Sequence, residues 1–251
     1  FLSGGIDSAL TLAIAVDALG AANVHAVMMP SRYTRSISTE DAIAEAQTLG
    51  VHYRIIDIDP LFEQFLDQLA PVFEGSEPDT SEENLQARIR GTLLMAISNK
   101  TGSMVLATGN KSEMAVGYAT LYGDMAGGFS VIKDVPKTLV YSLVRYRNSI
   151  SLVVPERVLN RAPSAELSFD QEDQQTLPSY QVLDAILKAY VEEDKPIVDI
   201  IQDGFNEITV RDVVRRVKLS EYKRRQAAPG VRISQRAFGR DRRYPITSAF
   251  L

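Results

Sequence analysis

Residues 2–10 read Leu2-Ser3-Gly4-Gly5-Ile6-Asp7-Ser8-Ala9-Leu10, and this stretch decides the fold of the chain. An apolar start runs into Ser-Gly-Gly and then directly into a helix-like run from Ser8 to Leu19. Two adjacent glycines permit a sharp turn and let a ligand approach the main chain closely. Ser8 can cap the helix, and the first N–H groups and the helix dipole then attract an anion such as phosphate. The stretch therefore predicts a phosphate-binding loop between a strand and a helix.

Asp7 is an unexpected residue beside a phosphate, because like charges repel. A divalent cation between the two removes the conflict, so the loop predicts a metal held by Asp7. An ordinary Gly-rich turn with a solvated aspartate remains the alternative for Ser-Gly-Gly alone. No lysine follows the glycines, so the loop is not the Gly-x-x-x-x-Gly-Lys-Ser/Thr type.

The length of 251 residues allows one large α/β domain, and the hydrophobic content of 45% is enough for a sizeable core. No apolar run approaches the ~20 residues that span a bilayer. The net charge of −5 argues against non-specific nucleic-acid binding. We therefore expect neither a membrane nor a nucleic acid as partner.

The chain contains no cysteine. Disulfides, thiolate metal sites and a cysteine nucleophile are thereby excluded within these residues, and a reducing cytoplasm is compatible with this composition. The strand that should precede Ser3 is nearly absent. We therefore expect a fragment that lacks residues before Phe1.

Positive charge is concentrated near the end of the chain. Residues 215–243 carry eleven Lys/Arg and two acidic residues. The rest of the chain carries sixteen Lys/Arg and thirty acidic residues. Residues 227–251 form a basic tail without periodicity. Such a tail on an acidic body folds back on that body, grips an anionic ligand or binds a partner.

Apolar runs that suit strands alternate with helical patterns along the chain. Strands are expected at 24–29, 51–58 and 104–107, and helices at 8–19, 39–49, 81–100, 137–148 and repeatedly between 179 and 225. This alternation predicts an α/β fold, a doubly wound parallel sheet with a helical C-terminal extension, in a single domain over residues 1–251. Residues 122–129 are too polar and Gly-rich for a strand and are expected to form a loop.

A second strand-to-helix turn, Thr108-Gly109-Asn110-Lys111-Ser112-Glu113, follows the strand at 104–107. Two such turns in a parallel sheet can face each other across a cleft. Glu113 is then the natural second carboxylate for a metal held by Asp7. The alternative is that Glu113 only complements the dipole of its own helix. Arg32, in the polar loop after the strand at 24–29, is a further candidate near a nucleotide.

Several spaced motifs together resemble the NAD synthetase family. They are the opening Ser-Gly-Gly-x-Asp-Ser, which the N-type ATP pyrophosphatases share, Thr108–Glu113, Tyr122-Gly-Asp-Met-Ala-Gly-Gly-Phe129, Lys133-Asp-Val-Pro-Lys137 and Arg161-Ala-Pro-Ser-Ala-Glu166. The order and spacing are most similar to the synthetase part of the glutamine-dependent enzymes. The resemblance covers essentially the whole chain, to about Arg225, and implies an adenine-nucleotide α-hydrolase-like sheet.

The resemblance also implies a reaction. ATP adenylates the nicotinate carboxylate of deamido-NAD and releases pyrophosphate; ammonia then attacks the acyl-adenylate, giving NAD and AMP. No protein nucleophile is required, so catalysis consists of positioning and charge neutralisation around the phosphates. ATP is a substrate and Mg²⁺ the implied cofactor.

The resemblance assigns roles residue by residue. It places the catalytic groups at Asp7, Glu113 and Lys137, with Asp7 and Glu113 on the metal. It implies that ATP contacts Ser3, Gly4, Gly5, Asp7, Ser8, Arg32, Thr108, Lys137 and Ser164. It implies that deamido-NAD contacts Asn84, Arg88, Tyr118, Ala119, Thr120, Leu121 and Lys223. A solvated helix end remains the alternative for Lys223.

Two departures from the family pattern matter. Phe1 stands where many relatives have glycine, and Leu121 stands where the enzymes that use free ammonia carry lysine. The second departure favours the glutamine-dependent branch, whose ammonia comes from a separate amidase domain with a catalytic cysteine. The chain should therefore use free ammonia or belong to a longer polypeptide that carries a glutaminase domain.

The resemblance further implies at least a homodimer, with the helix at 81–100 as the expected interface. Two competing readings remain. One is another adenylating ligase of the GMP synthetase type, and the other is a non-catalytic nucleotide-binding module. A nucleic-acid module acting through the basic tail is the weakest alternative, because the net charge of the chain is −5.

Overall fold

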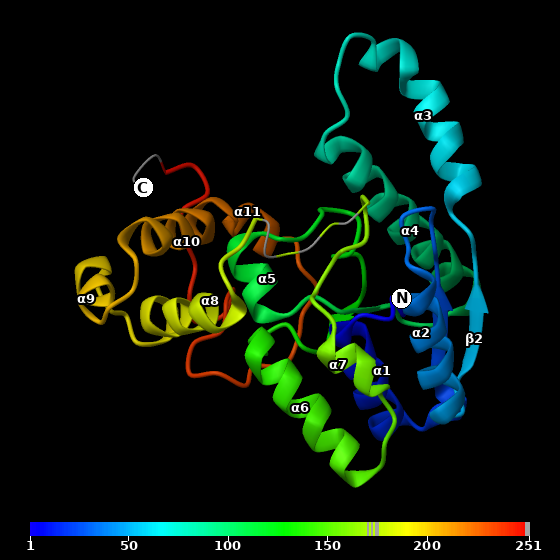
Figure 1. Ribbon diagram of the computed structural model, residues 1–251, viewed down its shortest axis with the longest axis horizontal. Helices are drawn as coiled ribbons and strands as arrows, with labels where there is room; N and C mark the ends of the chain where they lie inside the picture. The colour runs from blue at the N-terminus through cyan, green and yellow to red at the C-terminus, as the bar shows by residue number, and fades with distance from the viewer. Residues whose placement is uncertain (170, 172, 174–175, 249–251) are drawn as a thin grey trace.

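The protein is described from a computed structural model, which describes residues 1–169, 171, 173 and 176–248. Its elements follow in chain order as α1 (Ile6–Leu19), η1 (Ala21–Asn23), β1 (His25–Met28), α2 (Ser36–Thr48), β2 (His52–Ile55), α3 (Asp59–Phe73), α4 (Thr80–Thr101), β3 (Leu106–Ala107), α5 (Lys111–Val116), β4 (Phe129–Ser130), α6 (Lys137–Ile150), α7 (Glu156–Asn160), α8 (Tyr180–Leu187), the π-helical turn η3 (Lys188–Glu192), α9 (Ile197–Gln202), α10 (Glu207–Leu219) and α11 (Glu221–Arg224). Figure 1 shows α8, α9 and α10 grouped on one side of the molecule and α2, β2 and α3 on the other, with α1 and α6 side by side between them.

The strands are parallel, and the α/β fold class is confirmed. β1 pairs with β2, and β3 pairs with β4. The N–H of Leu2 donates to the carbonyl of Val27 at 2.9 Å, so the first residues run beside β1. The strands are shorter than the apolar runs that predicted them, since β2 covers four residues and β3 only two.

The expectation that residues 122–129 form only a loop was wrong at its end. Phe129 begins β4, a two-residue strand that pairs with β3. The N–H of Ser130 also donates to the carbonyl of Pro229 at 2.8 Å. The partners of this strand, β3 and Pro229, lie far from it along the chain.

Helix α1 begins two residues earlier than the sequence indicated, at Ile6. Gly5 occupies the N-cap position and Ser8 lies in the first turn, so the expected capping role of Ser8 was wrong. The Ser8 hydroxyl instead donates to the Gly5 carbonyl at 2.9 Å and accepts from the N–H of Ser3 at 3.2 Å. These bonds join the first turn of α1 to Ser3 and Gly5 and so fix the conformation of the loop.

The first glycine of the loop is required by both conformation and space. Gly4 has φ +81°, in the left-handed region that side chains disfavour. A Cβ there would lie 2.1 Å from the carbonyl oxygen of Ser38, at the start of α2. Gly5 has no such conflict, because a Cβ would find only the Ser3 hydroxyl, at 3.3 Å.

Replacing Gly4 by alanine is therefore expected to lower the free energy of unfolding by about 2 kcal/mol or more, since strain and a backbone clash add. The measurement is urea unfolding followed by circular dichroism. Gly5→Ala is the matched control and should cost less than half as much. Equal costs for the two variants would show that the close contact with Ser38 does not restrict this loop.

The apolar pattern all round α1 has a structural reason. One side of the helix, with Ile6, Ala9 and Leu10, packs against α6 in one core cluster. The other side, with Leu12 and Ala15, packs against β1 and α2 in a second cluster. A third cluster joins β1 to α3 and α4, and a fourth joins the C-terminal helices to α5 and to Phe238 and Tyr244 near the chain end. Within the described residues, no helix combines the length and the apolar character needed to cross a membrane.

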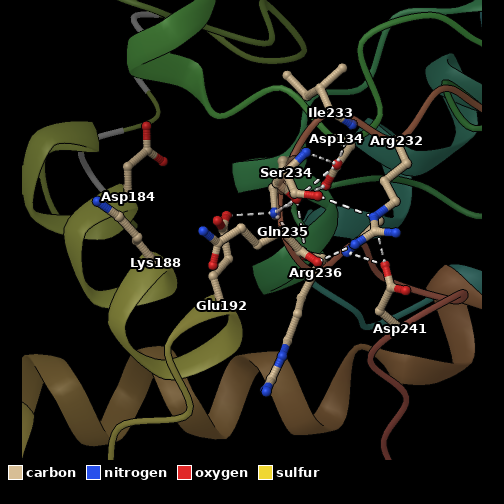
Figure 2. Close-up of polar contacts among 12 residues, drawn as sticks. Asp134, Asp184, Lys188, Glu192, Arg232, Ile233, Ser234, Gln235, Arg236 and Asp241 are labelled. Carbon is tan, nitrogen blue, oxygen red and sulfur yellow. Dashed lines mark hydrogen bonds and ion pairs between the residues drawn. The ribbon is translucent and has the colours of Figure 1, made fainter.

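The predicted helical extension is confirmed, and the basic tail folds back on the body. We call residues 227–244 the strap. Figure 2 shows its central part against Asp134 and Glu192. Asp134 accepts from the N–H groups of Ile233 and Ser234 at 2.8 and 2.7 Å. The buried ammonium of Lys111 donates to Glu192 at 2.7 Å and to Ser234 at 2.5 Å, so one lysine ties α5 to η3 and to the strap.

Part of the positive charge of the basic stretch 215–243 is neutralised by acidic side chains. Arg224 pairs with Glu221 at 3.0 Å and lies 4.6 Å from the ring centroid of Phe238 in the strap. Arg236 and Arg242 both pair with Asp194. Of the three roles that the sequence left open for the tail, these contacts show folding back on the acidic body.

Candidate functional site

A cavity of about 220 Å³ opens where the loop at the start of the chain meets the second strand-to-helix turn. Its wall combines the first loop (Ser3, Gly5, Asp7, Ser8), the second turn (Thr108, Gly109, Glu113), the start of α6 (Lys137) and the segment 161–167. The two turns therefore face one cavity, as their positions at the ends of parallel strands predicted.

Three helices begin at this cavity, and each brings one charged side chain. Asp7 lies in the first turn of α1, Glu113 in the first turn of α5, and Lys137 is the first residue of α6. The Lys137 ammonium contacts Oδ2 of Asp7 and lies 3.2 Å from Oε1 of Glu113. Two carboxylates from distant parts of the chain thus share one cation.

Asn110 fixes the two carboxylates relative to each other. Its side-chain carbonyl accepts from the N–H of Glu113 at 3.0 Å, and the Glu113 side chain accepts from the N–H of Asn110, which is a complete capping box. Its amide nitrogen donates to Oδ1 of Asp7 at 2.9 Å. Glu113 therefore lies where its charge complements the dipole of its own helix, as the alternative interpretation proposed. It also lines the cavity.

The electrostatics of the group reflect burial. Burial, followed by the neighbouring Asp7 carboxylate, raises the pKa of Glu113 to about 8. Burial lowers the pKa of Lys137, but the Asp7 and Glu113 carboxylates raise it more, so it lies above its ordinary value. The ammonium therefore stays charged, and it is the group that keeps two carboxylates compatible in one small space.

The donor set fits Mg²⁺. Carboxylate oxygens are its preferred protein ligands, and the oxygens of Asp7 and Glu113 already converge on one cation. Among the described residues there is no group of three or more acidic or histidine side chains placed to hold a metal. A metal held by two carboxylates takes its remaining ligands from phosphate oxygens and water, which Mg²⁺ readily does.

Helix α8 closes the site behind Lys137. The ring of Tyr180 lies 5.1 Å from the Lys137 ammonium, and its hydroxyl donates to Oδ2 of Asp173 at 2.7 Å. Oδ1 of Asp173 is buried and has no hydrogen-bond partner among the described residues. Asp173 also lines the cavity, so a third carboxylate faces the space beside Asp7 and Glu113.

The structure brings most of the predicted ATP-contacting residues to this cavity. Ser3, Gly5, Asp7, Ser8, Thr108, Lys137 and Ser164 line it. Gly4 turns its carbonyl toward Arg161, which donates to it at 2.6 Å. Arg32 lies elsewhere: its guanidinium is on the surface, 2.5 Å from Glu63 and 3.4 Å from Asp59. Those two acids at the start of α3 hold Arg32 away from the cavity.

The residues predicted to contact deamido-NAD form a second group around the 117–124 segment. The hydroxyl of Thr120 donates to Asn84 at 2.9 Å, and Arg88 donates to the carbonyl of Leu121 at 3.2 Å. Lys223 donates to the carbonyl of Ala119 at 2.6 Å. Tyr118 lies between the groups, because it also lines the cavity.

Sequence reasoning assigned no role to several charged residues of the cavity wall. Arg161 donates to Ser38 at 2.9 Å as well as to Gly4, and so ties the first loop to α2. Asp124 accepts from the N–H of Thr120 at 2.7 Å, and burial raises its pKa to about 6. Arg90 donates to the carbonyl of Met29 at 2.9 Å, and burial lowers its pKa to about 10. Arg161 and Asp124 belong to two of the family motifs, so the sequence offered a signal for both. Arg90 belongs to no such motif, and no sequence signal marks it.

Comparisons with known proteins give matches to one family over most of the chain. A family model described as NAD synthase matches residues 1–227. The chain is 59% identical to the glutamine-dependent NAD(+) synthetase of Acinetobacter baylyi over 99% of its own length and 46% of that relative. It is 55% identical to the enzyme of the same description from Thermotoga maritima, over 99% of its own length and 44% of the relative. The chain thus spans slightly less than half of the curated relatives that it matches.

Solved structures show the same relationship. The glutamine-dependent NAD+ synthetase of Acinetobacter baumannii, in complex with adenosine diphosphate, is 57% identical with a TM-score of 0.64, over 98% of this chain and 44% of that one. A glutamine-dependent NAD(+) synthetase from Cytophaga hutchinsonii has a TM-score of 0.81 at 22% identity, over 99% of this chain and 50% of that one. At that identity the likeness supports the fold alone.

Proposed function

The chain belongs to the NAD synthase family, and from that premise we propose that it forms NAD from deamido-NAD, ATP and ammonia. The observation that carries the proposal is the convergence of Asp7, Glu113 and Lys137 at three helix N-termini around one cavity. Helix N-termini and a buried ammonium suit phosphate groups, and paired carboxylates suit the metal that accompanies them. We take residues 1–251 as one synthetase unit.

In the proposed first step, a carboxylate oxygen of deamido-NAD attacks the α-phosphorus of ATP, and the bond to the β-phosphate oxygen breaks to release pyrophosphate. The main-chain N–H groups of the first loop and the hydroxyls of Ser3 and Ser8 hold the departing phosphates. Lys137 neutralises the negative charge that builds up on them. Thr108 and Ser164 contact ATP from the other walls of the cavity.

Asp7 and Glu113 are the residues that would hold Mg²⁺. Bound there, the metal would neutralise phosphate charge and orient the phosphate oxygens. The two carboxylates themselves serve a second purpose, since they fix the Lys137 ammonium at the point where the phosphates enter.

In the second step, ammonia attacks the carbonyl carbon of the acyl-adenylate, the bond to AMP breaks and the nitrogen loses a proton. The group formed by Asn84, Arg88, Thr120 and Lys223 holds deamido-NAD beside ATP. Lys223 and Arg88 supply positive charge for the dinucleotide's phosphates. Arg32 has no place in this proposal.

The source of the ammonia and the assembly complete the proposal. The chain takes ammonia from solution, or receives it from a glutaminase domain of a longer polypeptide, which the greater length of the relatives supports. We propose a homodimer in which α4 contributes to the interface, and a cytoplasmic site of reaction, where ATP is supplied.

The direct test supplies the purified protein with deamido-NAD, ATP, Mg²⁺ and ammonium chloride. We expect NAD, AMP and pyrophosphate in equal amounts, measured by chromatography and by coupled pyrophosphate detection. Xanthylate replaces deamido-NAD in the control, because a GMP synthetase-type enzyme would turn it over instead. Nucleotide binding without any product would favour a non-catalytic module.

A further inference from the structure

We infer that Asp184 of α8 is a positioning residue for Lys137 and Glu113. The kinetic test of this inference rests on the proposed function. Asp184 lies outside every recognised motif and touches neither of the two residues directly. Its carboxylate acts through the main chain at the start of α6 and through Ser112 of α5. It thereby fixes the two helices whose first turns carry the site.

Each oxygen of the Asp184 carboxylate has its own partners. Oδ1 accepts from the hydroxyl of Ser112, the residue before Glu113. Oδ2 accepts from both the N–H and the hydroxyl of Thr138, the residue after Lys137, at 2.8 Å each. The N–H of Lys137 donates to the Ser112 hydroxyl oxygen at 2.9 Å, and this bond completes the hydrogen-bond network that links α5, α6 and α8. All these bonds are buried or partly buried.

Helix α6 depends on this arrangement for its cap. Its N-cap residue is Pro136, whose ring has no hydrogen-bonding group. The first N–H groups of a helix need acceptors, and a carboxylate near them is favoured by the helix dipole. Here Ser112 and Asp184 satisfy the N–H groups of Lys137 and Thr138 from two other helices. The position of the Lys137 backbone is therefore set by α5 and α8.

The negative charge also fixes the direction of the hydrogen bonds. Thr138 donates twice to Oδ2, and Asp184 accepts the Ser112 hydrogen at Oδ1, which leaves the Ser112 oxygen free to accept from Lys137. An asparagine at 184 must turn its carbonyl toward Thr138, because the N–H of Thr138 can only donate. Its amide group then faces Ser112 as a donor, and the hydrogen of Ser112 loses its acceptor.

The test compares Asp184→Asn with the parent in steady-state kinetics and in ADP binding by calorimetry with Mg²⁺ present. A displacement of about 1 Å at a reacting group costs on the order of 100-fold in rate. We expect kcat to fall ~10-fold or more, the KM for ATP and the Kd for ADP to rise ~10-fold, and the KM for deamido-NAD to change less than ~2-fold. Ser112→Ala should give the same pattern, and the double variant no further loss.

Ile186→Val is the matched control, because Ile186 is a fully buried residue of the same helix in the C-terminal core. It should lower Tm and leave both KM values and the ADP affinity unchanged. If Asp184→Asn behaves like this control, with a smaller active fraction and unchanged KM and Kd, the positioning role is overturned. If the parent makes no NAD but Asp184→Asn still weakens ADP binding, the proposed function fails and the positioning of the nucleotide site stands.

Discussion

Lys137→Met is expected to lower kcat/KM for NAD formation about 1,000-fold, the largest loss for any single side chain of the site. Within the described residues, the Lys137 ammonium is the one cation that both Asp7 and Glu113 contact. Its removal leaves the charge of the departing pyrophosphate without its nearest protein counter-charge. Methionine keeps the apolar stem of lysine and removes only the ammonium, which lies 5.1 Å from the centroid of the Tyr180 ring. The loss therefore reports on charge and not on a cavity.

The variant should also change the carboxylates that remain. Without the ammonium, Asp7 and Glu113 repel each other in a buried space, so the pKa of Glu113 rises above its already raised value. The folded state loses a buried ion pair, which typically costs several kcal/mol when one partner is removed. Activity is therefore measured per folded molecule, with the folded fraction determined by circular dichroism.

Lys133→Met is the matched control for this experiment. Lys133 belongs to the same sequence motif and is partly buried, but its ammonium donates at 2.6 Å to the carbonyl of Ala228 in the strap. Its loss should weaken the attachment of the strap and leave kcat/KM within ~3-fold of the parent. A Lys137→Met enzyme that kept more than about a tenth of parent activity would contradict the assigned role.

Local signals predicted the parts of the site that lie at strand-to-helix turns. The Ser-Gly-Gly-x-Asp-Ser loop and the Thr108–Glu113 turn were recognisable because each is a short run of small and polar residues before a helix. The first loop also has a demanding backbone, with φ +81° at Gly4. Their approach followed from the rule that parallel strands end at one edge of a sheet. The error at the start of α1 arose because both Gly5 and Ser8 are good N-cap residues.

Apart from the approach of the two turns, the sequence did not predict which distant segments contact each other. The strap has no periodicity, and its attachment depends on Asp134 and Lys111, roughly a hundred residues away. The surface position of Arg32 was not predicted, because nothing local in the sequence shows that Asp59 and Glu63 face it. Asp184 sits in an ordinary amphipathic helix, and its role depends on two other helices. Burial and tertiary hydrogen bonds, rather than local preference, determine these features.

Glu45→Gln is expected to produce the largest effect on stability, an effect that grows as pH rises above about 4.5 and is greatest at alkaline pH. Glu45 lies on α2, is 1% exposed, and its Oε1 has no hydrogen-bond partner among the described residues. Burial, followed by the nearby Asp41 carboxylate, raises its pKa from 4.5 to about 8. Asp41 is itself 1% exposed and pairs with Arg157, so the negative charge of this pocket is already balanced without Glu45.

The sign of the pH dependence follows from proton counts. Between pH 4.5 and 8, the folded protein keeps a proton on Glu45 that the unfolded chain has released. Stability from this group is therefore fully present below about pH 4.5 and falls as pH rises toward 8. The shift from 4.5 to about 8 corresponds to about 5 kcal/mol of lost stability above pH 8.

Glutamine resembles the protonated acid and cannot ionise, so the variant should escape this loss. We expect the two proteins to have similar free energies of unfolding near pH 5 and the variant to be more stable by up to about 5 kcal/mol at pH 9, in urea titrations at each pH. Glu40→Gln, on the exposed side of the same helix, should follow the parent at every pH, because its carboxylate pairs with Arg157 near the surface. Parallel pH curves for the parent and Glu45→Gln would mean that Glu45 is ionised in the folded protein. The buried face of α2 would then hold two negative charges, and Arg157 and Arg161 would have to balance both.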